Sequence, residues 1–108
     1  MEINEYQKLA SRTIDTNKTN EELLLNAVMG LCGESGEVID LVKKYKFHRH
    51  PLNKEELIKE AGDVAWYLAE LATVLDIDLE EIMIQNIEKL KKRYPDGFDT
   101  NRSINREE

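Results

Sequence analysis

Proline and glycine are scarce in this chain, and this scarcity leaves room for little besides helices. The 108 residues contain two prolines, Pro51 and Pro95, and five glycines. Apolar residues such as Ile3, Tyr6 and Ala10 recur at three- and four-residue steps, which is the spacing of one helical face. Alternating runs of β-branched residues, which would favour strands, do not occur in the sequence. The pattern therefore predicts an all-α fold.

Four helices follow from this periodicity and from capping signals. We predict them over about 3–15, 19–45, 53–75 and 78–94, with a polar, irregular tail after Phe98. Each of the last three begins at a Ser/Thr/Asn/Asp-type residue with an acid three positions later, the usual N-terminal cap signal. These signals are Thr19 with Glu22, Asn53 with Glu56, and Asp78 with Glu81. We therefore divide the chain into a helical domain, residues 1–98, and a polar tail, residues 99–108.

The charge and cysteine content exclude several classes of protein. The chain has 15 Lys and Arg residues and 22 Asp and Glu residues, which gives a net charge of −7. Such a chain is a poor nucleic-acid binder, because that affinity comes mainly from Lys and Arg contacts with phosphates. One cysteine excludes a disulfide scaffold and suits a reducing compartment. No segment approaches the ~18 apolar residues of a membrane span. We expect a cytoplasmic protein that binds neither nucleic acid nor membrane.

Parts of the second and third predicted helices are apolar on nearly every side. These parts are residues 23–29 and 64–75. A helix that is apolar all round needs neighbours on more than one face. We therefore expect an oligomer, most simply a dimer that pairs the second and third helices of each chain. A monomer with an efficient core is the alternative.

Two pairs of acids stand at three-residue spacing within these two helices. Glu34 and Glu37 form one pair, and Glu60 and Asp63 form the other. Residues three apart project from nearly the same face of a helix, where like charges repel unless a cation lies between them. An antiparallel hairpin would bring the two pairs to similar heights. Four carboxylates without His or Cys suit Mg²⁺, with Mn²⁺ as a substitute. Acids that are merely exposed to solvent are the alternative.

Glycines accompany the acids. Gly30, Gly33 and Gly36 fall at three-residue steps in the second helix, and Gly62 lies between the acids of the third. A glycine inside a helix costs about 1 kcal/mol relative to alanine, so we expect something to approach the backbone closely there. A neighbouring helix and a bound substrate are equally good explanations.

The spacing of the four acids resembles that of a known family. Glu34-x-x-Glu37, then 22 residues, then Glu60-x-x-Asp63 is similar to the signature of the MazG-like nucleotide pyrophosphohydrolases. This all-α superfamily also includes dimeric dUTPases, dCTP pyrophosphatases and phosphoribosyl-ATP pyrophosphohydrolase. Residues 86–98 resemble the end of the same domain, so that the resemblance covers about residues 3–98.

The resemblance implies a reaction and a metal site. A nucleoside or deoxynucleoside triphosphate would be hydrolysed between its α and β phosphates to the monophosphate and pyrophosphate, as in the removal of unwanted nucleotides from the cellular pool. The fold would be a four-helix-bundle type of domain that assembles as a dimer or a dimer of dimers. The four motif acids would be the Mg²⁺ ligands and catalytic groups. They are Glu34, Glu37, Glu60 and Asp63.

Other positions match family residues that contact the nucleotide. By resemblance, Tyr67 contacts the nucleotide, and Asn86 and Lys89 reach the phosphates; Gln7 is a candidate for the base pocket. Some relatives carry an extra glutamate directly before the first motif acid, as a suspected general base. This chain has Gly33 there, so the resemblance leaves the base unassigned.

Two other functions fit the same sequence. One is phosphoribosyl-ATP pyrophosphohydrolase on the same scaffold. The other is a non-catalytic helical interaction module whose acids face solvent. Release of pyrophosphate from nucleotides, and a Mg²⁺-dependent rise in melting temperature, would separate these functions from the main hypothesis.

Overall fold

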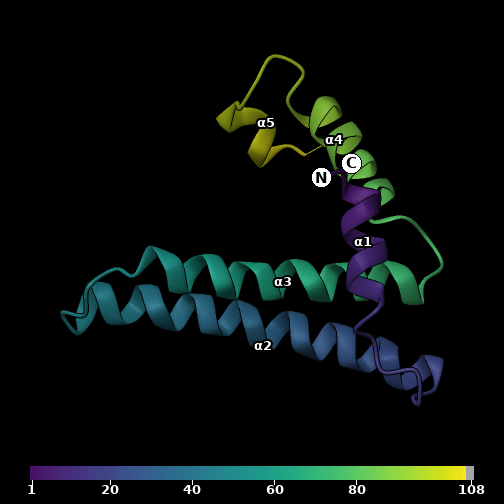
Figure 1. Cartoon of the computed structure of the whole chain (residues 1–108). Helices are drawn as coiled ribbons and strands as arrows, with labels where there is room; N and C mark the ends of the chain where they lie inside the picture. Colours follow the sequence, from purple (N-terminus) through teal and green to yellow (C-terminus); the bar gives the residue numbers. More distant parts are fainter. Residues whose placement is uncertain (107–108) are drawn as a thin grey trace.

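The computed structural model describes residues 1–106, which form five helices joined by short loops (Figure 1). The helices are α1 (Ile3–Ser11), α2 (Asn20–Phe47), α3 (Lys54–Val74), α4 (Leu79–Arg93) and α5 (Thr100–Ile104). Residues 1–106 contain no β-strand. Over the same residues, no helix has both the length and the apolar character needed to cross a bilayer. The predicted all-α class is confirmed.

The local capping chemistry explains where the helices begin. Thr19 accepts from the Glu22 backbone while the Glu22 side chain accepts from the Thr19 backbone, so the predicted capping box is confirmed. Asn53 accepts from the backbone N–H of Glu56 at 3.1 Å and caps α3 as predicted. The predicted side-chain cap at Asp78 is wrong. There the first N–H of α4, on Leu79, is bound instead by a side chain of α1.

Two boundaries differ from the prediction. The first helix ends at Ser11 rather than near Asp15, because the chain turns there through short-range bonds from Thr13 and Ile14 to the last carbonyls of α1. The prediction of an irregular tail is wrong for residues 100–104, which form α5. Asp99 caps this short helix by accepting from the Arg102 backbone N–H at 3.1 Å. Residues 107 and 108 of the predicted tail lie outside the described residues.

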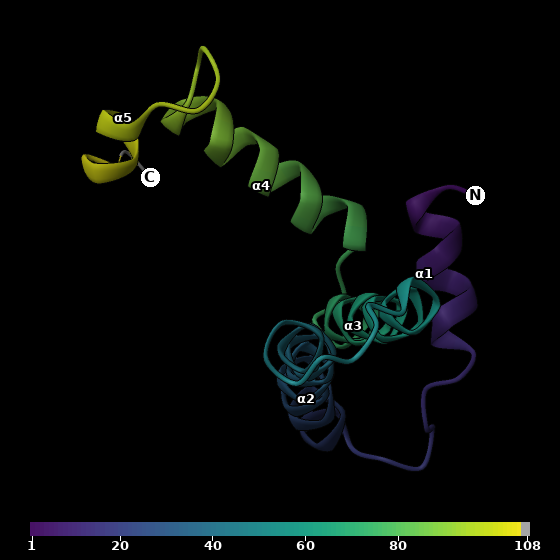
Figure 2. The same cartoon turned by 90° about the vertical axis from the view of Figure 1, so that its left-hand side faces the viewer.

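α2 and α3 form a long antiparallel hairpin, and α1 crosses α3 near its C-terminal end (Figures 1 and 2). The connection between the hairpin helices spans only residues 48–53, which is short enough to force them antiparallel. A small core lies where α1, α3 and α4 meet. Its buried members are Ala10, Ala69, Ala72 and Leu79, with Tyr6, Trp66, Leu68 and Ile82 packed against them.

A single chain is open rather than compact. α4 packs against α1 and α3 near its start and then stands off the hairpin (Figure 2), so one chain does not close a four-helix bundle. The radius of gyration is 16.9 Å, whereas a compact domain of about this length has roughly 13 Å. Large apolar side chains consequently remain exposed on α2 and α4. They include Leu25, Val28, Met29, Ile39, Val42, Met83, Ile84 and Ile87.

Candidate metal centre

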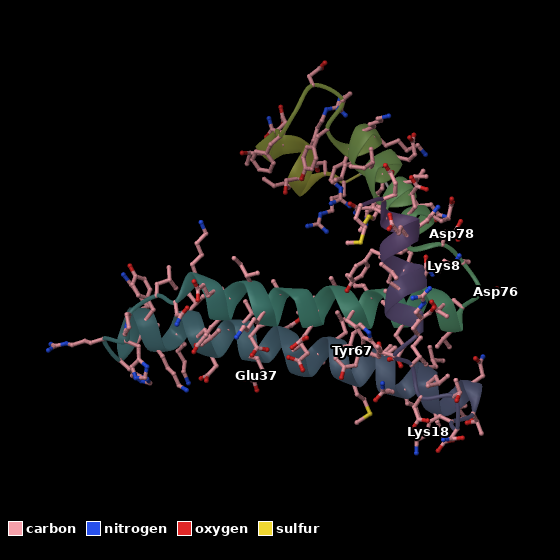
Figure 3. All side chains as sticks on the ribbon, viewed as in Figure 1. Lys8, Lys18, Glu37, Tyr67, Asp76 and Asp78 are labelled. Carbon is pink, nitrogen blue, oxygen red and sulfur yellow. The ribbon has the colours of Figure 1, made fainter. Side chains whose placement is uncertain are left out.

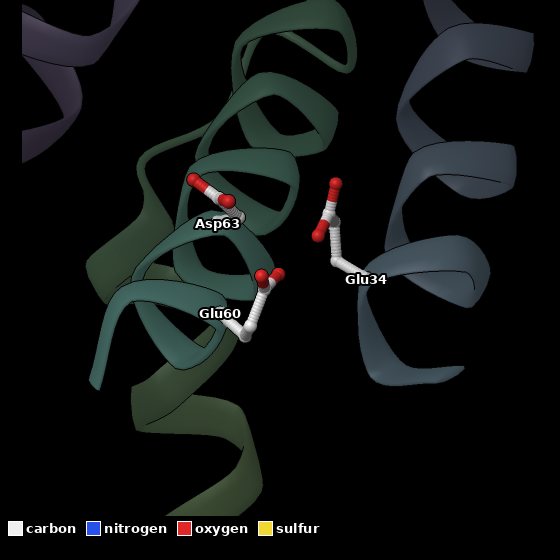
Figure 4. Close-up of side chains that lie close together, drawn as sticks. All are labelled: Glu34, Glu60 and Asp63. Carbon is white, nitrogen blue, oxygen red and sulfur yellow. The ribbon is translucent and has the colours of Figure 1, made fainter. Parts of the chain in front are cut away.

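Three carboxylates meet between the two hairpin helices. Glu34 projects from α2 toward Glu60 and Asp63 on α3 (Figure 4). One carboxylate oxygen from each side chain lies within 4.8 Å of the other two. Because the helices are antiparallel, a residue well before the end of α2 faces residues soon after the start of α3. The predicted juxtaposition of the two motifs is therefore present for three of their four acids.

The fourth predicted ligand, Glu37, is not part of this group. It lies one turn further along α2 and is exposed, at the position labelled in Figure 3. Three residues along a helix rotate the side chain by about 60° relative to Glu34 and advance it by about 4.5 Å. The carboxylate of Glu37 is therefore not among those that meet between the two helices.

The electrostatics of the group favour a cation. The pKa of Glu60 is raised above its ordinary value, first by its hydrogen bond with Glu34 and next by desolvation. The negative charges of Glu34, Asp63 and Glu56 raise the pKa further. A bound cation would remove this repulsion, and three carboxylates without nitrogen or sulfur donors match the oxygen preference of Mg²⁺ and Mn²⁺. The residues present therefore fit a hard divalent ion.

An aromatic wall adjoins the carboxylates. A cavity of about 380 Å³ is lined by Glu34, Asp63, Trp66 and Tyr67. The Trp66 indole N–H donates to the Thr13 hydroxyl at 2.8 Å. Trp66 and Tyr67 meet edge to face, with ring centroids 5.0 Å apart. Tyr67 thus lies beside the candidate metal centre, while Trp66 is fixed against the loop that follows α1. The predicted contact of Tyr67 with the nucleotide stays a prediction.

Gly30 is the glycine at which close approach is required. A Cβ built there would collide with the ring of Tyr67, whereas Gly33, Gly36 and Gly62 have no atoms within 4 Å of such a Cβ. In the single chain, the close approach of α3 explains the glycine at position 30. At Gly33, Gly36 and Gly62, no other part of the described chain approaches the backbone in this way.

α1 borders the carboxylate group through Tyr6. Burial raises the pKa of the Tyr6 phenol, and the nearby charge of Asp63 raises it further. Sequence analysis did not identify Tyr6 as a neighbour of the site, since its position at an apolar helical step indicates only core packing. The crossing of α1 over α3, a tertiary feature, brings it there.

Gln7 has a structural role in the single chain, and its suggested contact with the base stays a prediction. Its Nε2 donates to the Thr73 hydroxyl at 3.2 Å and to the Ile77 carbonyl at 3.0 Å. Its Oε1 accepts from the Leu79 backbone N–H at 2.6 Å. These bonds fasten α1 to the turn between α3 and α4, so the amide is already engaged away from Tyr67.

Asn86 and Lys89, the predicted phosphate contacts, are exposed on α4. Because α4 stands off the hairpin (Figures 1 and 2), the single chain does not bring them into the carboxylate group. Their predicted contact with phosphates therefore stays a prediction.

A polar pair that sequence analysis missed lies further along the same hairpin. Glu70 on α3 is 2% exposed, and both of its carboxylate oxygens accept from Asn26 Nδ2 on α2, at 2.9 and 3.0 Å. A signal was present, because Asn26 is the one polar residue in 23–29 and Glu70 the one acid in 64–75.

Comparisons with known proteins agree with this geometry. The model of the MazG nucleotide pyrophosphohydrolase domain matches residues 19–98, which include all four motif acids. The gene 37 protein of Mycobacterium phage L5 is 35% identical over 105 residues, covering 90% of this chain and 92% of that protein.

A second relative is the uncharacterized protein YvdC of Bacillus subtilis (strain 168). It is 36% identical over 73 residues, covering 59% of this chain and 69% of that protein. No solved structure matches significantly. With the matched domain spanning most of its length, the chain belongs to the MazG nucleotide pyrophosphohydrolase domain family.

Proposed function

We propose that this protein is a Mg²⁺-dependent nucleoside triphosphate pyrophosphohydrolase that removes unwanted nucleotides from the cellular pool. Water attacks the α-phosphorus in line, the bond to the α–β bridging oxygen breaks, and the products are the nucleoside monophosphate and pyrophosphate. The observation that carries this proposal is the group of carboxylates from Glu34, Glu60 and Asp63 in a chain of the MazG family.

The charges of enzyme and substrate make a divalent ion necessary. The chain has a net charge of −7, and a nucleoside triphosphate is itself strongly negative, so direct attraction fails. Glu34, Glu60 and Asp63 would hold the ion, and Glu37 on the adjoining turn would complete the set. Mg²⁺ supplies positive charge that stabilises developing negative charge on phosphate oxygens and lowers the pKa of water.

The side chains around the carboxylates would position the nucleotide. Tyr67 lies one turn after Asp63 and lines the same cavity as Glu34, where its ring offers a face for the nucleoside. A carboxylate of the group orients the water and accepts its proton. Lys89 and Asn86 would bind the pyrophosphate end of the substrate.

A second copy of this chain would complete the site. The exposed apolar side chains of α2 and α4 and the extended radius of gyration support an interface between copies, because water-exposed apolar patches of this kind usually mark such surfaces. A homodimer, or a dimer of dimers, would cover these faces and bring α4, with Asn86 and Lys89, to a hairpin. Site formation would then depend on assembly.

One experiment tests the reaction directly. The protein is incubated with each common NTP and dNTP plus Mg²⁺, and monophosphate, pyrophosphate and orthophosphate are measured separately. We expect equimolar monophosphate and pyrophosphate, and no product when the metal is chelated. Phosphoribosyl-ATP is included in the panel, because its preferential cleavage would assign the alternative activity.

Matched variants link the reaction to the site. Glu60→Gln removes one carboxylate of the group and keeps its shape, whereas Glu55→Gln removes an exposed acid at the start of the same helix. We expect turnover to be lost in the first variant and retained in the second. Absence of pyrophosphate release from every substrate, by a protein with intact helical circular dichroism, would overturn the proposal.

A further inference from the structure

The carboxyl group of Glu70 is buried and accepts hydrogen bonds from a single side-chain amide. Its side chain is 2% exposed, and among residues 1–106 the one side chain that donates to it is Asn26. An ionised carboxylate offers about four lone-pair sites, so one shared N–H leaves acceptor capacity unused. Burial raises the pKa of Glu70, although the hydrogen bond from Asn26 acts in the opposite direction.

A structural role explains this pair poorly. A buried ionisable group usually contributes less stability than an apolar side chain of similar size, because of its desolvation cost. Leu23, Leu25 and Met29 line the same cavity as Glu70, so apolar side chains are accommodated beside it. A buried acid with a perturbed pKa beside a cavity is a typical feature of a functional site.

Such a cavity adjoins the pair. It has a volume of about 360 Å³, which is within the usual range for small-molecule sites, and it lies between α2, α3 and the loop after α1. Five of its eight lining residues are polar or charged, and three are apolar. Its lining residues are Asp15, Lys18, Glu22, Leu23, Leu25, Asn26, Met29 and Glu70.

The cavity and the carboxylate group follow one another along α3. Glu70 follows Asp63 by seven residues, which is a rotation within about 20° of two full turns and a rise of about 10.5 Å. On α2, Asn26 precedes Glu34 by eight residues, a rise of about 12 Å and a rotation of about 80° beyond two full turns. Between these two positions on α3, Tyr67 packs its ring against the backbone of Gly30. This separation is comparable to that between the 5′-phosphate and the far edge of the base in a nucleotide.

We propose that Asn26 and Glu70 recognise the base of the substrate and select bases that carry an exocyclic amino group. This inference rests on the proposed function. The free acceptors of the pair are the remaining lone pairs of Glu70 and Asn26 Oδ1, which accepts no hydrogen bond within residues 1–106. The two N–H bonds of an amino group satisfy two acceptors. Uracil and thymine instead offer a single N–H flanked by carbonyl oxygens, which would face those acceptors unpaired.

The test uses substrate pairs in which an exocyclic amino group is replaced by a carbonyl oxygen and the adjacent ring nitrogen changes from an acceptor to a donor. dCTP and dUTP differ by an amino group against a carbonyl oxygen at C4, and dATP and dITP differ in the same way at C6. We expect kcat/KM to favour the amino member of each pair by about 10- to 100-fold, the usual effect of a hydrogen bond to a charged group. Equal values of kcat/KM within both pairs for the wild-type protein would overturn the inference without any variant.

Variants assign the selectivity to this pair. In Glu70→Gln the side chain presents an N–H as well as a carbonyl oxygen, so we expect both ratios to fall below about threefold. Glu55→Gln should leave both ratios unchanged. Ratios that survive in a folded Glu70→Gln protein would show that the carboxyl is merely structural. Absence of pyrophosphate release from all four substrates would overturn the proposed function itself, and base selection with it.

Discussion

The ring of Tyr67 on α3 lies directly against the backbone of Gly30 on α2, in the space that a side chain would otherwise fill. The contact joins the hairpin helices between the carboxylate group and the hydrogen-bonded pair Asn26–Glu70. It also fixes the orientation of an aromatic ring that lines the same cavity as Glu34 and Asp63. One residue without a side chain thus sets both the helix spacing and the wall of the site.

Gly30→Ala should therefore damage stability and activity together. The added methyl forces Tyr67 or the helices to shift, and overpacking of this kind costs about 1–3 kcal/mol. Gly36→Ala on the same helix meets no atom within 4 Å and should stabilise by up to about 1 kcal/mol, through helix propensity alone. Urea midpoints of the two variants provide the comparison. A Gly30→Ala protein as stable and active as the Gly36→Ala protein would contradict this role for Tyr67.

Sequence analysis predicted the helices and two of their caps because that information is local. The box at Thr19 and the cap at Asn53 depend on residues three positions apart. The side-chain cap predicted at Asp78 was wrong for a tertiary reason. Gln7, which is 72 residues from Leu79, accepts the N–H at the start of α4. The short helix after Asp99 was missed because five residues carry too little periodicity to distinguish a helix from a polar tail.

The carboxylate group was predictable because a six-residue connection and two long helices leave the hairpin little choice of register. Glu34, Glu60 and Asp63 accordingly meet. The pair Asn26–Glu70 was overlooked, since each residue is a single polar position in an apolar run. Only the register between α2 and α3 shows that the two positions face each other. The path of α4 away from the hairpin depends on packing at its first turn, and periodicity carries no information about it.

Mg²⁺ should raise the melting temperature, since a ligand that binds only the folded state stabilises it. At ten times its dissociation constant the ion contributes about 1.4 kcal/mol, which corresponds to roughly 6–11 °C for a domain of this size. Glu60→Gln should abolish the shift, and Glu55→Gln should retain it. Differential scanning calorimetry with and without Mg²⁺ measures the effect. An equal shift in both variants would show that the ion binds elsewhere.

Glu37→Gln should lower Mg²⁺-dependent turnover by about 100-fold, the upper range for residues that orient a metal centre. Because Glu37 is exposed, its substitution should change the free energy of unfolding by no more than about 0.5 kcal/mol. Pyrophosphate release and urea unfolding separate the two effects. Turnover at the wild-type rate would remove Glu37 from the site and leave three carboxylates as the complete set.

Glu70 should give the free energy of unfolding a characteristic pH dependence. Burial raises the folded-state pKa above the ordinary value of 4.5, so the folded protein binds the proton more tightly than the unfolded chain. This contribution is fully present below pH 4.5 and is lost as pH rises through the folded-state pKa. In Glu70→Gln, this decrease in the free energy of unfolding with rising pH should be absent.

Other ionisable groups face the same cavity, and their effects must be subtracted. Asp15, Lys18 and Glu22 line it with Glu70. The pKa of Glu22 is lowered by its hydrogen bonds with Thr19, so its contribution is present above the ordinary pKa and lost as pH falls. The free energy of unfolding of both proteins is measured with urea from pH 4 to 8. Subtracting the value for Glu70→Gln from that for wild type cancels the contributions of these other groups. A pH-independent difference would contradict a raised pKa at Glu70.

Ile87→Asp should weaken self-association and reduce turnover at low protein concentration. Ile87 is 49% exposed in the single chain and lines an apolar hollow on α4 with Ile3, Met83 and Ile84. Loss of such a side chain from an interface costs about 1.5–3 kcal/mol, or roughly 10- to 100-fold in the dissociation constant. Gln85→Asp adds the same charge about 160° around the helix and should have little effect. Sedimentation equilibrium measures association, and an active wild-type protein that sediments at 12.6 kDa would show that the single chain is itself the catalytic unit.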